Sequence, residues 1–422
     1  MTTLSEATRR NVINTLLVAL ADNYVFPDKA AEMSDYIQGK LEAGSYSTID
    51  DVHVLAERLK VDMQHVTSDE HIRLRHDPDA FARLKAQDAR PDTDDDPNVQ
   101  IFIERERYDN FGFKRVERLA GNIGYIRLDA FVNVEWAGKT AAVAMNFVAE
   151  CHALIFDLRN NGGGHSTMVQ FISSYLFRGS RHLNTWYWRP TDSYKQLWTQ
   201  AHVQGKKLTD IPVYVLTSVK TFSAAESFTY GLKHSERATV VGETTKGGAH
   251  PGGEMAIEEG FVIWMPQGQD VNAITNSNFE GIGVIPHIAV SEEKALKTAH
   301  LHALKQIRDN VAEDQQDRLQ WEYETARVQY EPHVIAPDLL TRYIGSYGQK
   351  IFSLDNAMLM MRDTSSRPHP LTPVNDTVFM HERADNMRYE FVIPEGADRA
   401  TALNYIFRDG DPIVTIPRDA EG

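Results

Sequence analysis

Residues 212–228 read PVYVLTSVKTFSAAESF, an apolar run that is followed by turn residues and then by a helical pattern. A second apolar run, ALIF at residues 153–156, precedes the segment DLRNNGGGHS. Both runs are too uniformly apolar for a sheet that has one face in water, so we expect helices or a second sheet to cover both faces. The two runs therefore predict the central strands of a layered core.

Outward from these strands, extended and helical patterns alternate between about residues 118 and 290. Further strands are predicted at NIGYIRL, ATVVGE and FVIWMP, and helices near residues 138–150, 165–177 and 224–235. This order predicts an α/β core, which we assign to residues 118–300.

Residues 1–78 carry three helical patterns and predict a helical domain. The first pattern has an apolar stripe at three- and four-residue intervals, formed by Val12, Ile13, Leu16, Leu17 and Leu20. No signal-peptide cleavage site follows it, and no apolar run reaches the ~20 residues that cross a bilayer. We expect a soluble, cytoplasmic protein without membrane insertion, with periplasmic or secreted locations as alternatives.

The remaining segments complete the predicted organisation. Residues 79–117 are expected to form connecting strands and an exposed acidic loop, ARPDTDDDPN. Charged helical patterns indicate a bridge at residues 301–334. Short strands separated by turn residues then predict a small β-domain, barrel or sandwich, at residues 335–422.

Composition narrows the classes of function. A formal net charge of -15 would repel nucleic acids and anionic membranes, so neither is an expected partner. The single cysteine, Cys151, excludes an intramolecular disulfide and is interpreted as a core residue. The chain has no HExxH motif and no paired Cys/His spacing, so we predict no metal and no organic cofactor.

Three segments at predicted strand ends have the composition of a functional site. They are DLRNNGGGHS from Asp157, SVKTFSAAESF from Ser218 and VVGETTKGGAHPGG from Val240. Loops that leave the strand ends of an α/β protein commonly carry function. The glycines 162–164 can present bare N–H groups to an oxyanion or a phosphate, although the Gly-Lys-Ser/Thr of a phosphate loop does not follow.

Ser223 has two interpretations. It lies where a helix begins, so unpaired amides and the helix dipole would favour negative charge beside its hydroxyl, as an acyl-transfer nucleophile requires. The same SAAE segment, from Ser223 to Glu226, also has the spacing of a helix capping box. Glu226 is expected to be a capping or structural residue in either case.

Several ordered motifs resemble the tail-specific protease family, including the tricorn core and the interphotoreceptor retinoid-binding modules. The motifs are TSDEHIRL, GNIGYIRLDAF, DLRNNGGG, TFSAAESF, RATVVGETTKGGAHP and NFEGIGVIP. The resemblance runs from residue 1 to about 300 and implies a ClpP/crotonase-like core. The C-terminal strands resemble small barrel domains that follow other serine hydrolases.

The resemblance implies roles for individual residues. Ser223 matches the family nucleophile, His71 the base, and Glu280 the acidic residue of the tricorn-type set. The N–H groups of Gly163 and Ala224 match the oxyanion hole.

Two positions depart from the family patterns. The processing branch has its lysine where Gly248 stands, two positions after Lys246, so a serine-lysine dyad is disfavoured. The tricorn set has a serine where this chain has Glu70, and Ser68 lies two positions earlier. His250 is interpreted as a loop-shaping residue.

These assignments predict a serine hydrolase that cleaves a peptide, amide or ester carbonyl through an acyl-enzyme. The alternatives are a non-catalytic carrier of a hydrophobic small molecule, and an enzyme of the same fold in a small-molecule biosynthetic pathway. About 50 residues separate His71 from the strand near Asn122, too few for the PDZ domain that processing relatives insert there. The expected partners are a peptide or acyl substrate and, in a homo-oligomer, further copies of the chain.

Overall fold

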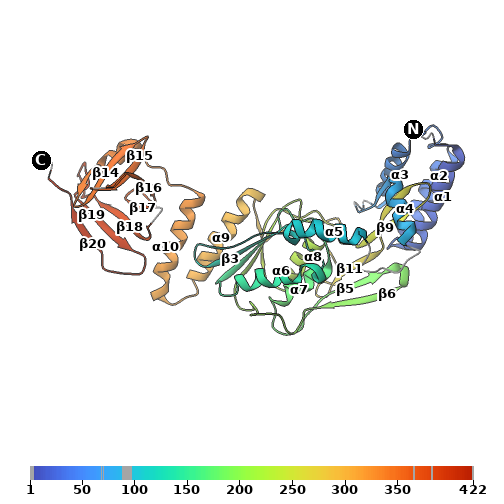
Figure 1. Ribbon diagram of the computed structural model, residues 1–422, viewed down its shortest axis with the longest axis horizontal. Coiled ribbons are helices and arrows are strands. Elements are labelled where there is room, and N and C mark those ends of the chain that lie inside the picture. Colours follow the sequence, from blue (N-terminus) through green and yellow to red (C-terminus); the bar gives the residue numbers. More distant parts are fainter. Residues whose placement is uncertain are drawn as a thin grey trace. The chain divides into compact units, whose positions relative to one another are not determined.

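The computed structural model describes residues 4–67, 69, 71–87, 97–364, 366–381 and 384–420. The chain forms two compact units, which are described separately below. The first comprises Met1–Glu117 and Gly124–Ala295, and the second comprises Arg118–Ile123 and Leu296–Gly422. Figure 1 labels the helices and strands of both.

A six-stranded sheet lies in the α/β core. Its order is β12-β8-β7-β4-β3-β2, and β4, β7, β8 and β12 are parallel neighbours. The strands are β2 (Phe113–Leu119), β3 (Ile123–Leu128), β4 (Ala153–Asp157), β7 (Val213–Thr217), β8 (Thr239–Gly242) and β12 (Ile288–Ala289). Every residue of β4 and β7 is buried, which confirms the prediction from their uniform hydrophobicity.

Three helices pack on this sheet and confirm the predicted α/β alternation. They are α6 (Val134–Phe147), α7 (Ser166–Ser174) and α8 (Ala224–His234), each beginning or ending within a few residues of its expected position. Apolar side chains from the helices and from β4 and β7 form one core cluster, in which Phe156 and Phe228 are in edge-on contact. This core fixes the start of α8, where Ser223 lies.

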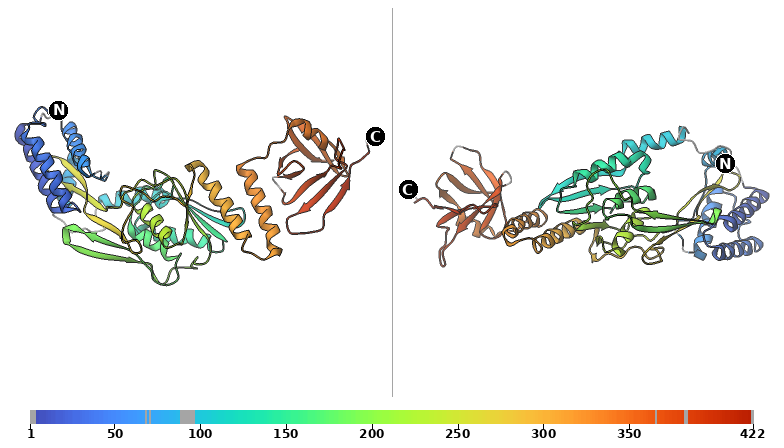
Figure 2. Two further views of the ribbon diagram at one scale, coloured as in Figure 1. Left: turned by 180° about the vertical axis from the view of Figure 1, so that it is seen from behind. Right: turned by 90° about the horizontal axis from the view of Figure 1, so that it is seen from below.

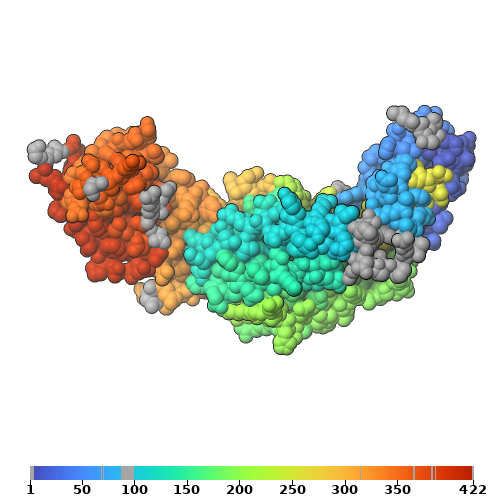
Figure 3. Space-filling view, viewed as in Figure 1, coloured from blue at the N-terminus to red at the C-terminus, as the bar shows by residue number. Residues whose placement is uncertain are grey.

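The N-terminal helices form a bundle that shares its core with strands from later in the chain. The helices are α1 (Glu6–Asn23), α2 (Pro27–Glu42) and α3 (Val52–Thr67). They are followed by β1 (Arg73–His76), which pairs with β10 (Phe261–Pro266), which in turn pairs with β9 (Gly252–Ala256). Figures 2 and 3 show these late strands, in yellow, among the blue helices. This pairing brings the residues before β1 to the core of the first unit.

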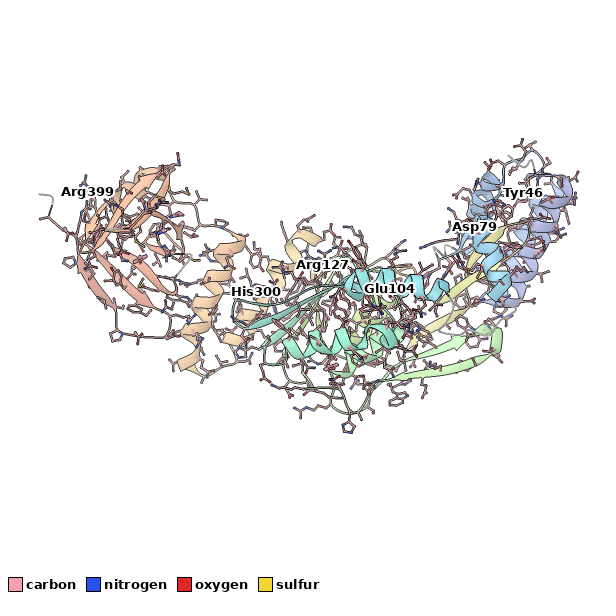
Figure 4. The ribbon with its side chains drawn as sticks, in the orientation of Figure 1. Tyr46, Asp79, Glu104, Arg127, His300 and Arg399 are labelled. Atoms are coloured by element: carbon pink, nitrogen blue, oxygen red, sulfur yellow. The ribbon has the colours of Figure 1, made fainter. Side chains whose placement is uncertain are left out.

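A buried carboxylate holds the bundle together. Asp62 of α3 accepts a hydrogen bond of 2.8 Å from the hydroxyl of Tyr46, which Figure 4 labels, and one of 2.6 Å from the ammonium of Lys40. Burial opposes ionisation of Asp62, but these donors outweigh it and lower the pKa of the carboxyl.

The prediction of strands across residues 79–117 is wrong for most of the described part of that segment. Two helices occur there, α4 (Pro78–Gln87) and α5 (Pro97–Tyr108), followed by the short η1 (Asn110–Gly112) and the beginning of β2. A proline begins each helix, where its missing N–H costs nothing. Asp77 also caps α4 by accepting a hydrogen bond of 2.9 Å from the N–H of Ala80. Residues 89–96 of the predicted acidic loop ARPDTDDDPN lie outside the described residues.

A three-stranded antiparallel ribbon follows α7 in the first unit. Its order is β11-β5-β6, with β5 (His182–Trp188), β6 (Ser193–Trp198) and β11 (Gly268–Asn272). The short η2 (Arg189–Thr191) connects β5 to β6. In β5 and β11, Trp186 and Asp270 are direct cross-strand neighbours, so both side chains lie on the same face of the ribbon.

The second unit contains two long helices and an eight-stranded antiparallel sheet. After α9 (Glu292–Arg308), α10 (Glu313–Tyr330), α11 (Pro337–Leu340) and η3 (Thr341–Tyr343), the strands pair in sequence order. They are β13 (Gly345–Tyr347), β14 (Lys350–Asp355), β15 (Met358–Asp363), β16 (His369–Pro373), β17 (Val378–His381), β18 (Ala384–Val392), β19 (Ala402–Phe407) and β20 (Val414–Pro417).

This sheet curls so that its two ends meet. The N–H of Asp419, just after β20, donates a hydrogen bond of 2.9 Å to the carbonyl of Ser346 in β13. The sheet is therefore nearly closed, which confirms the predicted small barrel-like domain. Within the described residues, no helix has both the length and the apolar character needed to span a membrane.

Candidate active site

Ser223 lies in a strained turn between β7 and α8. It is the N-cap residue of α8 and has φ +54° and ψ −121°, a left-handed conformation that is uncommon for a residue with a side chain. Buried hydrogen bonds hold this turn, including one of 2.8 Å from the Thr221 hydroxyl to the carbonyl of Leu158 and one of 3.1 Å from the N–H of Phe222 to the carbonyl of Asn161. Strain of this kind persists where the surrounding structure enforces it, and functional sites are common among such places.

Glu226 is a structural residue of this turn, as predicted. Its carboxylate accepts a hydrogen bond of 2.8 Å from the N–H of Ser223. It also accepts bonds from the N–H groups of Gly247 and Gly248, at 2.6 and 2.9 Å, and from the Thr245 hydroxyl. One buried carboxylate thus ties the start of α8 to the loop after β8, although its burial raises the pKa of Glu226.

The glycine-rich loop after β4 packs directly on Ser223. A Cβ atom added to Gly163 would lie 2.8 Å from the Cβ of Ser223 and 3.1 Å from the N of Ala224, so only glycine allows this approach. The N–H of Gly163 donates a 2.8 Å hydrogen bond to Asn161 Oδ1 and is therefore engaged in this conformation. No acceptor contacts the N–H of Ala224 or of Gly164 among the residues that the structure describes.

His71 lies against the residue that precedes Ser223. Its imidazole is only 5% exposed and lies between the rings of Phe222 and Trp264, with centroid separations of 4.7 and 5.2 Å. A Cβ atom added to Gly248 would lie 2.5 Å from His71 Cε1. The pairing of β1 with β10 thus brings an N-terminal imidazole to the loops that hold Ser223.

Asp69 is the acidic neighbour of His71, and the sequence interpretation missed it. Its Oδ1 accepts a hydrogen bond of 2.9 Å from the backbone N–H of His71 and lies 3.5 Å from His71 Nδ1. Its Oδ2 accepts a hydrogen bond of 3.1 Å from the hydroxyl of Tyr24 and lies 3.6 Å from Nδ1 of His250. Burial raises the pKa of Asp69, but the two imidazoles and the backbone N–H outweigh burial and hold it well below its ordinary value.

Glu280, which matches the acidic residue of the tricorn-type set, contacts His250. Its Oε2 lies 3.4 Å from His250 Nδ1 and accepts a hydrogen bond from the N–H of Ala249. Burial raises the pKa of Glu280. His250 therefore connects two carboxylates, Asp69 and Glu280, a larger role than the predicted shaping of a loop.

Asp69, His250 and Glu280 also have the composition of a cation site, because one potential ligand atom from each lies within 4.8 Å of the others. The same atoms already face one another, and Tyr24 and the backbone of Ala249 and His71 donate to the carboxylates. Their arrangement is accounted for by these internal contacts.

Of the remaining family positions, Lys246 lies beside Phe222. The Nζ atom of Lys246 lies over the ring of Phe222, 4.8 Å from its centroid. Ser68 and Glu70, which flank Asp69, lie outside the described residues.

A small cavity of about 50 Å³ opens beside Ser223. Its polar lining includes Ser223, Ser227 and Asp270, and its apolar lining includes Val169 and Phe279. The site thus contains a half-buried serine at a helix N-terminus, a histidine–carboxylate pair beside the residue that precedes this serine, and a cavity lined by the serine and by the ribbon.

Comparison with known proteins identifies the class of protein. A model described as peptidase family S41 matches residues 122–290, and a model of the N-terminal domain of peptidase S41 in eukaryotic IRBP matches residues 3–105. Together these matches cover well over half of the chain. The protein belongs to peptidase family S41.

Solved structures of other proteins are similar to parts of this chain. A candidate peptidase of Parabacteroides merdae superposes with a TM-score of 0.50 at 19% identity, covering 72% of this chain and 99% of the other. A photosystem II D1 C-terminal processing protease gives a TM-score of 0.45 at 14% identity, with 69% and 94% of the two chains covered. The tricorn protease gives 0.45 at 14% identity, with 72% and 37% covered.

Proposed function

We propose that this S41 peptidase is a serine hydrolase in which Ser223 attacks a carbonyl carbon and His71 acts as the general base. The observation that carries the proposal is the joint placement of both residues. A strained serine at a helix N-terminus lines a cavity, and a buried imidazole next to an ionised carboxylate packs on the adjoining Phe222. A nucleophile, a base and a group that orients the base are the parts that acyl transfer requires.

The contacts of His71 assign a role to each of its nitrogen atoms. Because Nδ1 faces Asp69, Nε2 is the atom left to accept the proton of the Ser223 hydroxyl. Asp69 stabilises the imidazolium that forms, since its low pKa keeps it ionised. His250, between Asp69 and Glu280, is a positioning residue for that carboxylate.

The proposed reaction uses these groups in turn. The Ser223 oxygen forms a bond to the carbonyl carbon, and negative charge develops on the carbonyl oxygen. The N–H of Ala224 and the dipole of α8 stabilise that charge. His71 returns its proton to the leaving group as the carbon–nitrogen or carbon–oxygen bond breaks, and water, activated by the same base, hydrolyses the acyl-enzyme.

The second donor to the oxyanion comes from the glycine loop. Gly164 lines the cavity, and its N–H has no acceptor among the described residues. The N–H of Gly163, which we predicted for this role, takes part only if it leaves Asn161 Oδ1. We therefore propose Ala224 and Gly164 as the donors in this conformation.

Labelling with a fluorophosphonate probe tests the proposal. The wild-type protein should be labelled at Ser223, and Ser223→Ala should not be labelled. His71→Ala should reduce the labelling rate by about 100-fold or more, because a positioned base contributes about that factor. Ser193→Ala, which changes an exposed serine in β6, is the matched control. Rapid labelling of His71→Ala would contradict the assigned base.

No specific observation favours the alternative of a carrier for a hydrophobic molecule. The cavity beside Ser223 has about 50 Å³, whereas pockets for small-molecule ligands usually have about 300–1,000 Å³. Recruitment to a small-molecule pathway, a cytoplasmic location and homo-oligomer formation stay predictions.

A further inference from the structure

Asp270 is a buried carboxylic acid, and one of its two oxygens makes no hydrogen bond among the described residues. It lies in β11 opposite Trp186 of β5 and is 5% exposed. Its Oδ2 accepts hydrogen bonds of 2.7 Å from the Ser227 hydroxyl and 2.8 Å from the Asn184 side-chain amide. Its Oδ1 is buried and makes no hydrogen bond among the described residues, although the neutral indole N–H of its cross-strand neighbour Trp186, which also makes none, interacts with the carboxyl. If Asp270 served only to connect the ribbon to α8, Oδ2 alone would be sufficient, because both hydrogen bonds go to that oxygen.

This carboxyl lines the same cavity as the proposed nucleophile. Ser223, Ser227 and Asp270 all contribute to its wall. Ser227 follows Ser223 by four residues, and on a helix such residues are neighbours about 5–6 Å apart at their Cβ atoms. Because Ser227 donates directly to Asp270, the carboxyl lies beside the turn of α8 that follows the proposed nucleophile.

No positively charged side chain accompanies Asp270. The lining of the cavity contains no lysine, arginine or histidine among the residues described, and the groups that donate to the carboxyl are neutral. Burial raises the pKa of Asp270 to about 6, so the group is mostly ionised at neutral pH. A buried carboxylate that lacks a cation is unfavourable, and such a group gains most from a ligand that supplies one.

We propose that this cavity receives the side chain on the acyl side of the bond that Ser223 cleaves, and that Asp270 selects lysine at that position. The inference rests on the proposed function of Ser223. Lysine matches the site because its four-carbon stem is narrow and its ammonium is a compact donor. The methylenes would pack on Val169 and Phe279, and the ammonium would donate to the unused Oδ1. The planar guanidinium of arginine is bulkier in a cavity of this size.

A matched pair of substrates tests the selectivity. Two fluorogenic peptide amides differ only in lysine or norleucine before the cleaved bond, so that shape is retained and charge is removed. For the wild-type protein we expect kcat/KM about 100-fold higher for the lysine substrate, as for a buried charge pair that replaces an unpaired charge. In Asp270→Asn this ratio should fall close to one, mainly through the lysine substrate. Asp192→Asn, in the exposed β5–β6 connection, should keep the wild-type ratio.

The fluorophosphonate label separates the two ways in which the experiment can fail. If Ser223 is labelled but norleucine is cleaved as fast as lysine, the selectivity is wrong and the hydrolase assignment stands. If Ser223 is not labelled and neither peptide is cleaved, the hydrolase assignment falls and the selectivity falls with it. An unchanged ratio in a folded Asp270→Asn protein would also overturn the role of Asp270. Should that variant not fold, inhibition of the wild type by peptide aldehydes with lysine or norleucine decides the question.

Discussion

Replacing Asp270 with asparagine should stabilise the protein progressively as the pH rises. The carboxyl is buried without a cation, and its pKa is raised to about 6 from an ordinary value of 3.8. A raised carboxyl pKa means that the folded state holds its proton more tightly than the unfolded state does. The contribution of Asp270 to stability is therefore fully present below about pH 4 and is lost as the pH rises through 6. Asparagine keeps an oxygen for Ser227 and Asn184 and never ionises.

The size of the effect follows from the shift. A shift of about two pKa units corresponds to roughly 3 kcal/mol between the limits of low and high pH. About 2 kcal/mol of this change falls between pH 4 and pH 8, because ionisation of the unfolded chain has already begun at pH 4. We expect the variant to gain that much stability relative to the wild type over this range.

Urea denaturation at several pH values measures the change. Five of the six tryptophans lie in the first unit, so intrinsic fluorescence reports mainly on the unit that contains Asp270. The quantity to compare is the difference in unfolding free energy between the variant and the wild type. The contributions of all other titrating groups are the same in both proteins and cancel in this difference. Asp192→Asn is again the control and should show no trend. A difference that stays constant from pH 4 to pH 8 would refute the burial argument.

Three further substitutions test the turn and the base. Ser223→Gly should be about 1 kcal/mol more stable than Ser223→Ala, because glycine adopts φ +54° without strain while both variants lack the hydroxyl; equal melting temperatures would contradict the strain. Gly248→Ala should lower turnover by about 100-fold, because the added Cβ would lie within about 2.5 Å of the rings of Phe222 and His71 and would displace the base. Unchanged turnover would contradict this close approach. Asp69→Asn should reduce kcat about 10⁴-fold with KM little changed, because loss of the carboxylate that orients a catalytic histidine has that effect in other serine hydrolases. A small effect on kcat would show that Asp69 has no part in the mechanism.

Local sequence patterns predicted most helices and strands of the core. They failed in the segment where residues that begin helices determined the structure more strongly than the hydrophobic periodicity did. The uniform hydrophobicity of residues 153–156 and 213–216 predicted buried strands because such strands have no face that tolerates water. The strands expected across residues 79–117 are instead largely helical, since Pro78, Pro97 and the Asp77 cap begin helices there.

For the site, a helix start after a strand drew attention to Ser223, because such a pattern is visible in a linear sequence. His71 and Glu280 were indicated only by the resemblance of their motifs to the family. The links between these residues depend on contacts between distant segments. Only the pairing of β1 with β10 brings His71 and Asp69 to His250, and only the ribbon brings Asp270 to Ser227. Hydrogen bonding and burial depend on distance in space, and separation along a chain does not encode that distance. The sequence by itself therefore determined the family, the core and the candidate nucleophile, whereas the tertiary structure decided which carboxylates lie near that residue.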